Sequence, residues 1–173
     1  MFTPTLILAT LCAVATNVAQ AQVPATYRKV YITSAVNTQF VVVPKTATAA
    51  NGGLVVVQTN TKSPTQQWHL TSNSTKIYLA SNPTLCLDAG AKTAWKDMAP
   101  VYTNTCSDTA PGQKWIALAD GRIAVDGSSP QECLDLQYMQ AKQNNPVGLY
   151  ACAGLGNTGA KDKGINWPLV DVV

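Results

Sequence analysis

Short apolar runs separated by turn-forming residues make up most of this chain. The runs are rich in Val, Ile and Tyr, and Gly, Pro, Asn, Ser and Thr stand between them, with no long stretch of helical period. Runs of this length, bounded by turn formers, are typical of β-strands. We predict twelve strands, at Arg28–Ile32, Gln39–Val43, Leu54–Gln58, Gln67–Thr71, Lys76–Ala80, Leu85–Asp88, Pro100–Thr103, Lys114–Leu118, Arg122–Val125, Cys133–Leu136, Val147–Ala151 and Trp167–Val170.

Two tripeptides recur along the chain at one spacing. Gln66–Trp68, a Gln-x-Trp motif, returns 47 residues later as Gln113–Trp115. Cys86–Asp88, a Cys-Leu-Asp motif, also returns 47 residues later, as Cys133–Asp135. Unrelated motifs that repeat with one period indicate an internally repeated fold.

A third copy of the unit is more divergent. Phe40–Val42 lies 46 residues before Cys86–Asp88, and Trp167 lies 52 residues after Trp115. Three units of four strands predict an all-β, closed architecture with few exposed sheet edges. The equivalent tryptophans Trp68, Trp115 and Trp167 are expected to face inward and fill a shared core around a pseudo-threefold axis.

The glutamines of the repeated motifs are predicted to be structural. A buried amide both donates and accepts, so Gln66 and Gln113 can tie together the backbone of a turn. In the third unit Ile165 stands where this glutamine would be.

The first 21 residues have the pattern of a cleaved secretory signal. Leu6 to Ala15 is apolar but too short to span a bilayer, and Ala19–Ala21 offers small residues at a cleavage site, although no Lys or Arg precedes the apolar run. We therefore expect a domain of residues 22–173 that is secreted, extracellular and not inserted in a membrane.

Charge and cysteine content narrow the function further. The formal net charge is +3 from 12 basic and 9 acidic residues, and the basic residues are scattered, so no nucleic-acid partner is expected. Four cysteines remain once Cys12 leaves with the signal, which predicts two disulfides in an exported chain. Equivalent cysteines should pair within their own unit, Cys86 with Cys106 and Cys133 with Cys152.

Metal ions and cofactors are not expected, because four cysteines are committed to disulfides and one His cannot build a ligand set. Asn73 begins an N-glycosylation sequon, which is predicted to lie in a surface turn between units.

The order of these motifs resembles the ricin B-chain-type lectin domain. The resemblance covers the chain from about Tyr27 to Val173 and rests on two sets of Cys-Leu-Asp, a second Cys and Gln-x-Trp in the same order. It implies a β-trefoil that binds glycans or glycoproteins, often through galactose or N-acetylgalactosamine, without metal and without catalysis.

The resemblance also implies site residues, which are most complete in the third unit. There Asp135 matches the carboxylate that accepts hydrogen bonds from sugar hydroxyls, and Tyr150, two positions before Cys152, matches the stacking aromatic residue. The turn after Cys152 is longer than in the second unit, so Asn157 or Asp162 could complete the site, or the loop could block it.

The other two units match less well. The second unit keeps Asp88 and Gln113, but Asn104 replaces the aromatic residue. In the first unit Val42 stands in place of the Asp and Gln58 in place of the aromatic residue, so no sugar site is expected there. Because single sites of this open kind bind weakly, useful avidity would need two sites or a homo-oligomer.

Other interpretations stay open at this point. Both aspartates can simply anchor turns, and Trp95 can be either a stacking residue near Asp88 or a loop cap. A trefoil can instead present its loop Ala153–Gly164 to a protease or another protein, or be a degenerate, structural protein. An enzyme is not expected, because glycoside hydrolysis needs two carboxylates about 5 to 9 Å apart and the repeated aspartates belong to different units.

Overall fold

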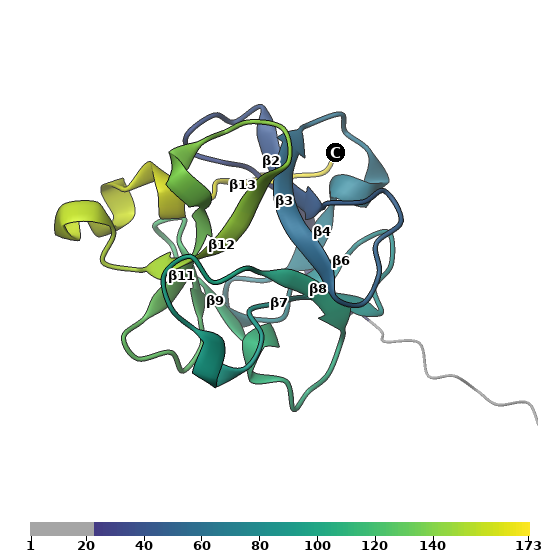
Figure 1. The fold of residues 1–173 in the computed structure, drawn as a ribbon. Coiled ribbons are helices and arrows are strands. Elements are labelled where there is room, and N and C mark those ends of the chain that lie inside the picture. Colours follow the sequence, from purple (N-terminus) through teal and green to yellow (C-terminus); the bar gives the residue numbers. More distant parts are fainter. Residues whose placement is uncertain (1–22) are drawn as a thin grey trace, which may run out of the picture.

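Thirteen strands and seven short 3-10 helices run through residues 23–173, the part of the chain described by this computed structural model (Figure 1). The predicted signal segment and its cleavage point lie outside these residues. The strands are β1 (Arg28–Ile32), β2 (Phe40–Pro44), β3 (Gly53–Thr59), β4 (Trp68–Leu70), β5 (Asn73–Thr75), β6 (Tyr78–Leu79), β7 (Leu85–Asp88), β8 (Tyr102–Thr105), β9 (Trp115–Ala117), β10 (Ile123–Val125), β11 (Glu132–Leu136), β12 (Asn145–Ala151) and β13 (Leu169–Asp171).

Each of the twelve predicted strands overlaps one of these elements, and β5 is an addition. The prediction that Asn73–Thr75 forms a turn is wrong, because these residues pair antiparallel with Trp115–Ala117. Burial of Thr75 explains the difference, since its hydroxyl accepts a hydrogen bond from the N–H of Thr71 at 3.1 Å and holds the segment against the sheet. The side chain of Asn73 stays exposed.

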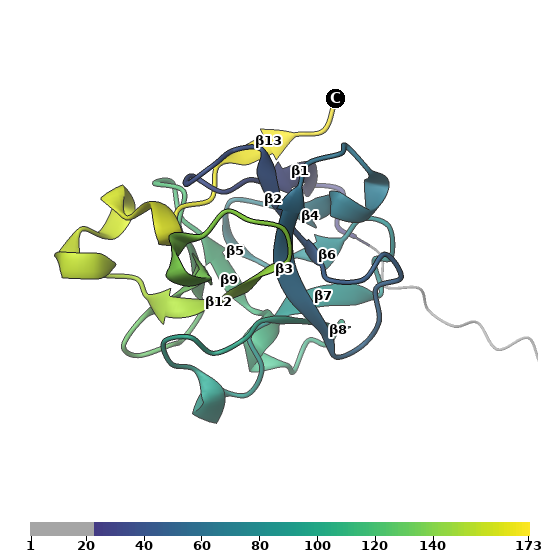
Figure 2. The ribbon, with the colours of Figure 1, turned by 45° about the horizontal axis from the view of Figure 1, so that its top comes forward.

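Three equivalent hairpins give the fold its repeat. They are β2–β3, β7–β8 and β11–β12, in which Val41 pairs with Gln58, Cys86 with Asn104 and Cys133 with Tyr150. Strand β3 also pairs with β8 and with β12, which joins the three hairpins to one another. The first strand β1 pairs with both β4 and β13, so the two ends of the described chain meet in one sheet (Figure 2).

The three repeated tryptophans fill the core as predicted. Trp68, Trp115 and Trp167 are fully buried in one cluster with the inward aliphatic residues of all three units. Their indole N–H groups donate hydrogen bonds of 2.8, 3.0 and 2.8 Å to the carbonyls of Val42, Leu87 and Leu134, respectively. Each tryptophan thus combines a large apolar contact with a satisfied donor.

These bonds also correct the alignment of the first unit. Because Val42 receives the bond that Leu87 and Leu134 receive, Val42 is the equivalent of the Leu in Cys-Leu-Asp. Val43, and not Val42, therefore stands in place of Asp88. The predicted equivalence of Val42 with the Asp is wrong by one residue, because no cysteine marks this strand in the first unit.

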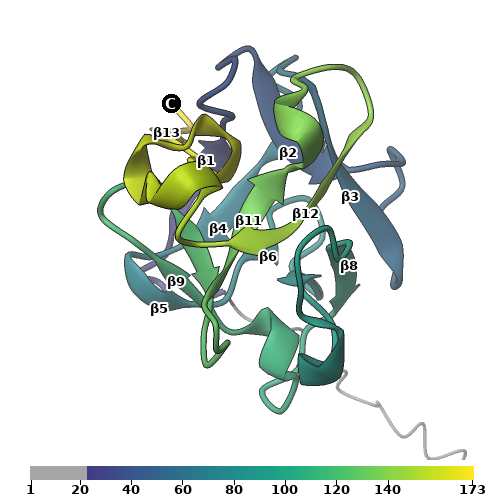
Figure 3. The ribbon, with the colours of Figure 1, turned by 60° about the vertical axis from the view of Figure 1, so that its left-hand side comes forward.

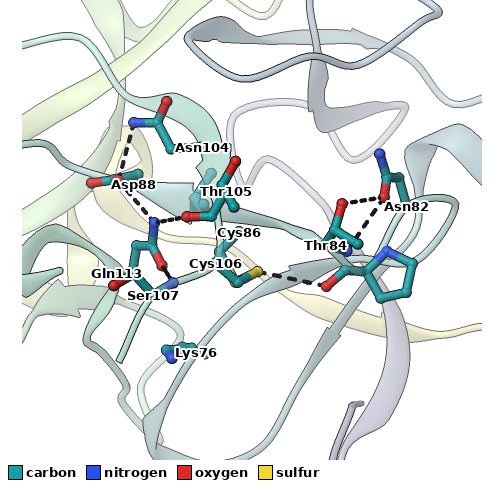
Figure 4. The surroundings of a disulfide bond; sticks show 12 residues. Lys76, Asn82, Thr84, Cys86, Asp88, Asn104, Thr105, Cys106, Ser107 and Gln113 are labelled. Atoms are coloured by element: carbon teal, nitrogen blue, oxygen red, sulfur yellow. Dashed lines mark hydrogen bonds between the residues drawn. A yellow bond between two sulfur atoms is a disulfide. The ribbon is translucent and has the colours of Figure 1, made fainter. Parts of the chain in front are cut away.

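The amides of Gln66 and Gln113 tie turns together, as predicted. The Gln66 side chain accepts from the N–H of Thr61 at 2.8 Å and donates to the carbonyl of Thr59 at 2.9 Å. Gln113 makes the two equivalent backbone bonds at 2.8 and 2.9 Å (Figure 4).

Both disulfides close within a unit, as the repeat predicted. Cys86 is bonded to Cys106 and Cys133 to Cys152, each with a Cα–Cα distance of 5.0 Å. Figure 4 shows the first of these bonds beside the turn that Gln113 holds. Among residues 23–173 there is no helix long and apolar enough to cross a membrane.

Candidate functional site

The hairpin β11–β12 directs Asp135 and Tyr150 to the same side of the sheet. Asp135 pairs with Gly148, and Tyr150 pairs with Cys133 two positions away. Because side chains alternate along a strand, their neighbours Leu134 and Leu149 point the other way, into the core, where both are fully buried. The aspartate and the tyrosine therefore lie on the outer face of the hairpin.

A pocket of about 380 Å³ brings these two side chains together. Its lining consists of Met98, Asp135, Tyr138, Met139, Tyr150, Leu155 and Asp162. The pocket opens to solvent, since the side chain of Tyr138 is 74% exposed. The two main residues expected from the resemblance thus share one concave surface.

Asp135 is only 6% exposed, yet none of the described residues donates a hydrogen bond to its carboxylate. Burial, together with the negative charges of Asp162 and Asp97, raises the pKa of Asp135 to about 7. A carboxylate of this kind gains free energy from any ligand that donates hydrogen bonds to it.

The long loop after β12 contributes to the wall of the pocket. It forms three short turns, η5 (Leu155–Asn157), η6 (Gly159–Lys161) and η7 (Lys163–Ile165), which stand beside β11 and β12 (Figure 3). Leu155 and Asp162 line the pocket, whereas Asn157 is exposed on the loop and is not among the lining residues. Of the two polar candidates in this loop, the structure brings only Asp162 to Asp135.

Asp162 also replaces the missing turn glutamine of the third unit. Its two carboxylate oxygens accept hydrogen bonds from the N–H groups of Leu155 and Gly164, both at 2.8 Å. Ile165, at the glutamine position, is instead fully buried beside the disulfide. Asp162 therefore holds the loop backbone in place of the glutamine, but with Ile165 at the glutamine position the site lacks an amide donor.

Sequence reasoning missed Tyr138 and Met139, which line the pocket from the turn η4 (Gln137–Met139). Both have left-handed backbone, with φ of 58° and 52°, and their side chains are 74% and 39% exposed. Non-glycine residues in this region are uncommon. The available signal was an aromatic residue and a methionine in an otherwise polar loop three and four positions after Asp135.

The second unit builds a closed network from its predicted residues. One oxygen of Asp88 accepts from the N–H of Gly90 at 2.7 Å. The other oxygen accepts from Asn104 and Gln113, both at 3.0 Å, as Figure 4 shows. Gly112 packs so closely that a Cβ there would lie 2.4 Å from the Asp88 carboxylate. The structure therefore brings together Asp88, Asn104 and Gln113, but both amides are hydrogen-bonded to the Asp88 carboxylate.

Replacing Asp88 with asparagine should destabilise the protein by about 1 to 3 kcal/mol, because an amide nitrogen cannot accept the bonds that one carboxylate oxygen now receives. Urea unfolding at neutral pH measures the change. Asp126→Asn serves as the control, since Asp126 lies outside this network and the substitution removes the same charge. An unchanged midpoint for Asp88→Asn would show that the network adds nothing to stability.

The first unit has no carboxylate at this position, and Val43 occupies it. Gln58 donates to the carbonyl of Lys45 at 3.3 Å and to the side chain of Asn144 at 2.8 Å, so it joins neighbouring segments. That the first unit binds no sugar stays a prediction.

Trp95 acts as a loop cap. Its indole N–H donates to the carbonyl of Gly90 at 3.2 Å, and its partly buried ring packs against the main core. This geometry favours the structural alternative over a stacking role.

Between residues 23 and 173 no group of three or more His, Cys, Asp or Glu side chains is placed to hold a metal ion. His69 lies on β4, whereas Asp88 and Asp135 lie on β7 and β11, in different hairpins. Burial, and then the charge of Lys29, lower the pKa of His69.

Three hairpin units around one tryptophan core define a β-trefoil, with a solvent-open pocket in the third unit. A family model, the ricin-type β-trefoil lectin domain, matches residues 31–115 and 75–163. The chain therefore belongs to this family, which supports a carbohydrate-binding role. No curated protein sequence matches the chain.

Solved structures share the fold at low sequence identity. The designed three-fold symmetric protein ThreeFoil has a TM-score of 0.68 at 18% identity and covers 83% of this chain and 99% of its own. The C-half of an earthworm R-type lectin, solved in complex with GalNAc, has a TM-score of 0.63 at 14% identity and covers 84% and 99%. The Rhizoctonia solani agglutinin has a TM-score of 0.63 at 16% identity and covers 88% and 100%.

Proposed function

We propose that this protein is a secreted, non-catalytic lectin that binds glycans in the pocket of its third unit. The observation that carries the proposal is the Asp135 carboxylate, buried without a donor of its own at the pocket that Tyr150 lines. Hydroxyl groups of a sugar supply such donors, and bonds to a charged acceptor are the strong ones.

The apolar side chains around the carboxylate suit the other face of a sugar. The rings of Tyr138 and Tyr150 and the side chain of Leu155 offer surface against which C–H groups pack. The family membership supports a glycan ligand, and the GalNAc bound to the earthworm lectin makes galactose-type sugars the first candidates for testing.

Secretion is supported by the predicted signal segment and by the two disulfides, which persist in oxidising compartments. Because one unit carries an open pocket with a free carboxylate, we further propose that avidity comes from self-association of the chain.

Glycan-array binding of the secreted protein tests the proposal. We expect Asp135→Ala to lower retention on a galactose or N-acetylgalactosamine matrix at least about tenfold, since one lost bond to a charged group is worth about 1.5 to 3 kcal/mol. Tyr150→Ala should also lower retention, because the sugar loses the ring against which its C–H groups pack. Asp126→Asn, outside the pocket, should bind as the parent does. Retention unchanged by both pocket substitutions, or no array signal at all, would contradict the proposal.

A further inference from the structure

We propose that the glycan bound by the third-unit pocket carries a free, protonated amino group, as in polymers of de-N-acetylated hexosamine. This inference rests on the proposed lectin function and specifies its ligand class. The pocket lining, the comparison with the second unit and the local charge all point to a cationic ligand.

The side chains of the lining are rich in acceptors, and the only donors among them are the two tyrosine hydroxyls. Its polar groups are the carboxylates of Asp135 and Asp162 and the hydroxyls of Tyr138 and Tyr150, and the remaining lining side chains are apolar. An ammonium group has three donors and no acceptor, whereas a sugar hydroxyl or an acetamide carbonyl also needs a donor. The lining is therefore matched to an ammonium group better than to neutral substituents.

Comparison with the second unit shows which hydrogen-bond donor the third unit lacks. Asp88 receives three hydrogen bonds from its surroundings, one of them from Gln113. In the third unit Ile165 replaces that glutamine, and none of the described residues donates to Asp135. The carboxylate of Asp135 is as deeply buried as that of Asp88, but any group that donates a hydrogen bond to it must come from outside the described residues.

The charges that act on Asp135 from neighbouring segments are all negative. Asp162 comes from the loop after β12, and Asp97 comes from the segment before β8, where it accepts from the N–H of Ala151 at 2.8 Å. Together with burial, they raise the pKa of Asp135 to about 7. A cation placed between the carboxylates relieves this repulsion, and the tyrosine rings at the pocket add cation–π attraction.

Calorimetric titration with a glucosamine oligomer and with its fully N-acetylated counterpart tests the inference. At a pH near 7 and low salt, we expect the free-amine oligomer to bind at least about tenfold more tightly than the acetylated one. Added sodium chloride should reduce that difference. Asp135→Asn should abolish it, whereas Asp126→Asn, which removes the same charge outside the pocket, should leave it intact.

The possible outcomes separate this inference from the function beneath it. Equal or tighter binding of the acetylated oligomer, or of galactose, through Asp135 would overturn the amine proposal and leave the lectin proposal standing. Binding of a lysine-rich peptide through Asp135, without binding of the amino sugar, would also overturn it. No binding by any glycan would reject the lectin function itself.

Discussion

Replacing Asp135 with asparagine should make the protein more stable at pH 8, by about 2 to 4 kcal/mol, while it weakens glycan binding. The pKa of Asp135 is raised from an ordinary value of 3.8 to about 7, and one pKa unit corresponds to about 1.4 kcal/mol. A neutral amide in the same place avoids the cost of a buried charge beside two other carboxylates. Under the proposed lectin function, this loss of stability accompanies a group that binds the ligand.

The effect should depend on pH in a defined direction. A folded-state pKa above the unfolded one means that the folded protein holds the proton more tightly, so Asp135 favours folding fully below about pH 4. That contribution is lost as the pH rises through about 7, the folded-state value. The advantage of Asp135→Asn should thus be largest at pH 8 and nearly vanish at pH 4.

Urea unfolding at several pH values measures this difference between the parent and the variant. Glu132, whose pKa is also raised, chiefly by burial, is present in both proteins and cancels in the comparison. Asp126→Asn controls for the change in net charge. A variant that is less stable than the parent at pH 8 would show that Asp135 is paired in solution.

Features marked by a repeated, chemically distinctive residue could be predicted from the sequence. The tryptophans, the turn glutamines and the cysteines each occur at least twice, and a role inferred for Trp68 or Gln66 could be checked against Trp115 or Gln113. The resemblance matched Asp135 and Tyr150 to the carboxylate and the ring of one site, and the alternation of side chains along β11 and β12 places both on the outer face of the hairpin.

Features that depend on packing between segments could not be predicted in this way. Tyr138 reaches the pocket because its backbone is left-handed, which no sequence period encodes. Asn157 and Asp162 were equivalent candidates in one loop, and the bonds that Asp162 makes to the loop backbone decided between them. The strand at Asn73–Thr75 forms because β9 offers it a partner, and its own sequence reads as a turn.

Removing the indole of Trp167 should have the other large effect, because this side chain links the core to the pocket. Trp167→Ala should cost about 3 to 5 kcal/mol from the lost burial alone. Trp167→Phe keeps most of the apolar contact but removes the donor to the carbonyl of Leu134, and an unsatisfied buried carbonyl costs about 1 to 3 kcal/mol. Leu134 immediately precedes Asp135, so the same bond fixes the strand that carries the carboxylate.

Trp68→Phe provides a matched control, since Trp68 makes the equivalent bond to Val42 in the unit without a carboxylate. Unfolding in guanidinium chloride should show similar losses of stability for the two Phe variants. Glycan affinity at a temperature where both are folded should fall only for Trp167→Phe, because only that bond supports the strand of Asp135. Equal affinities would mean that the hairpin holds Asp135 in place without help from the core.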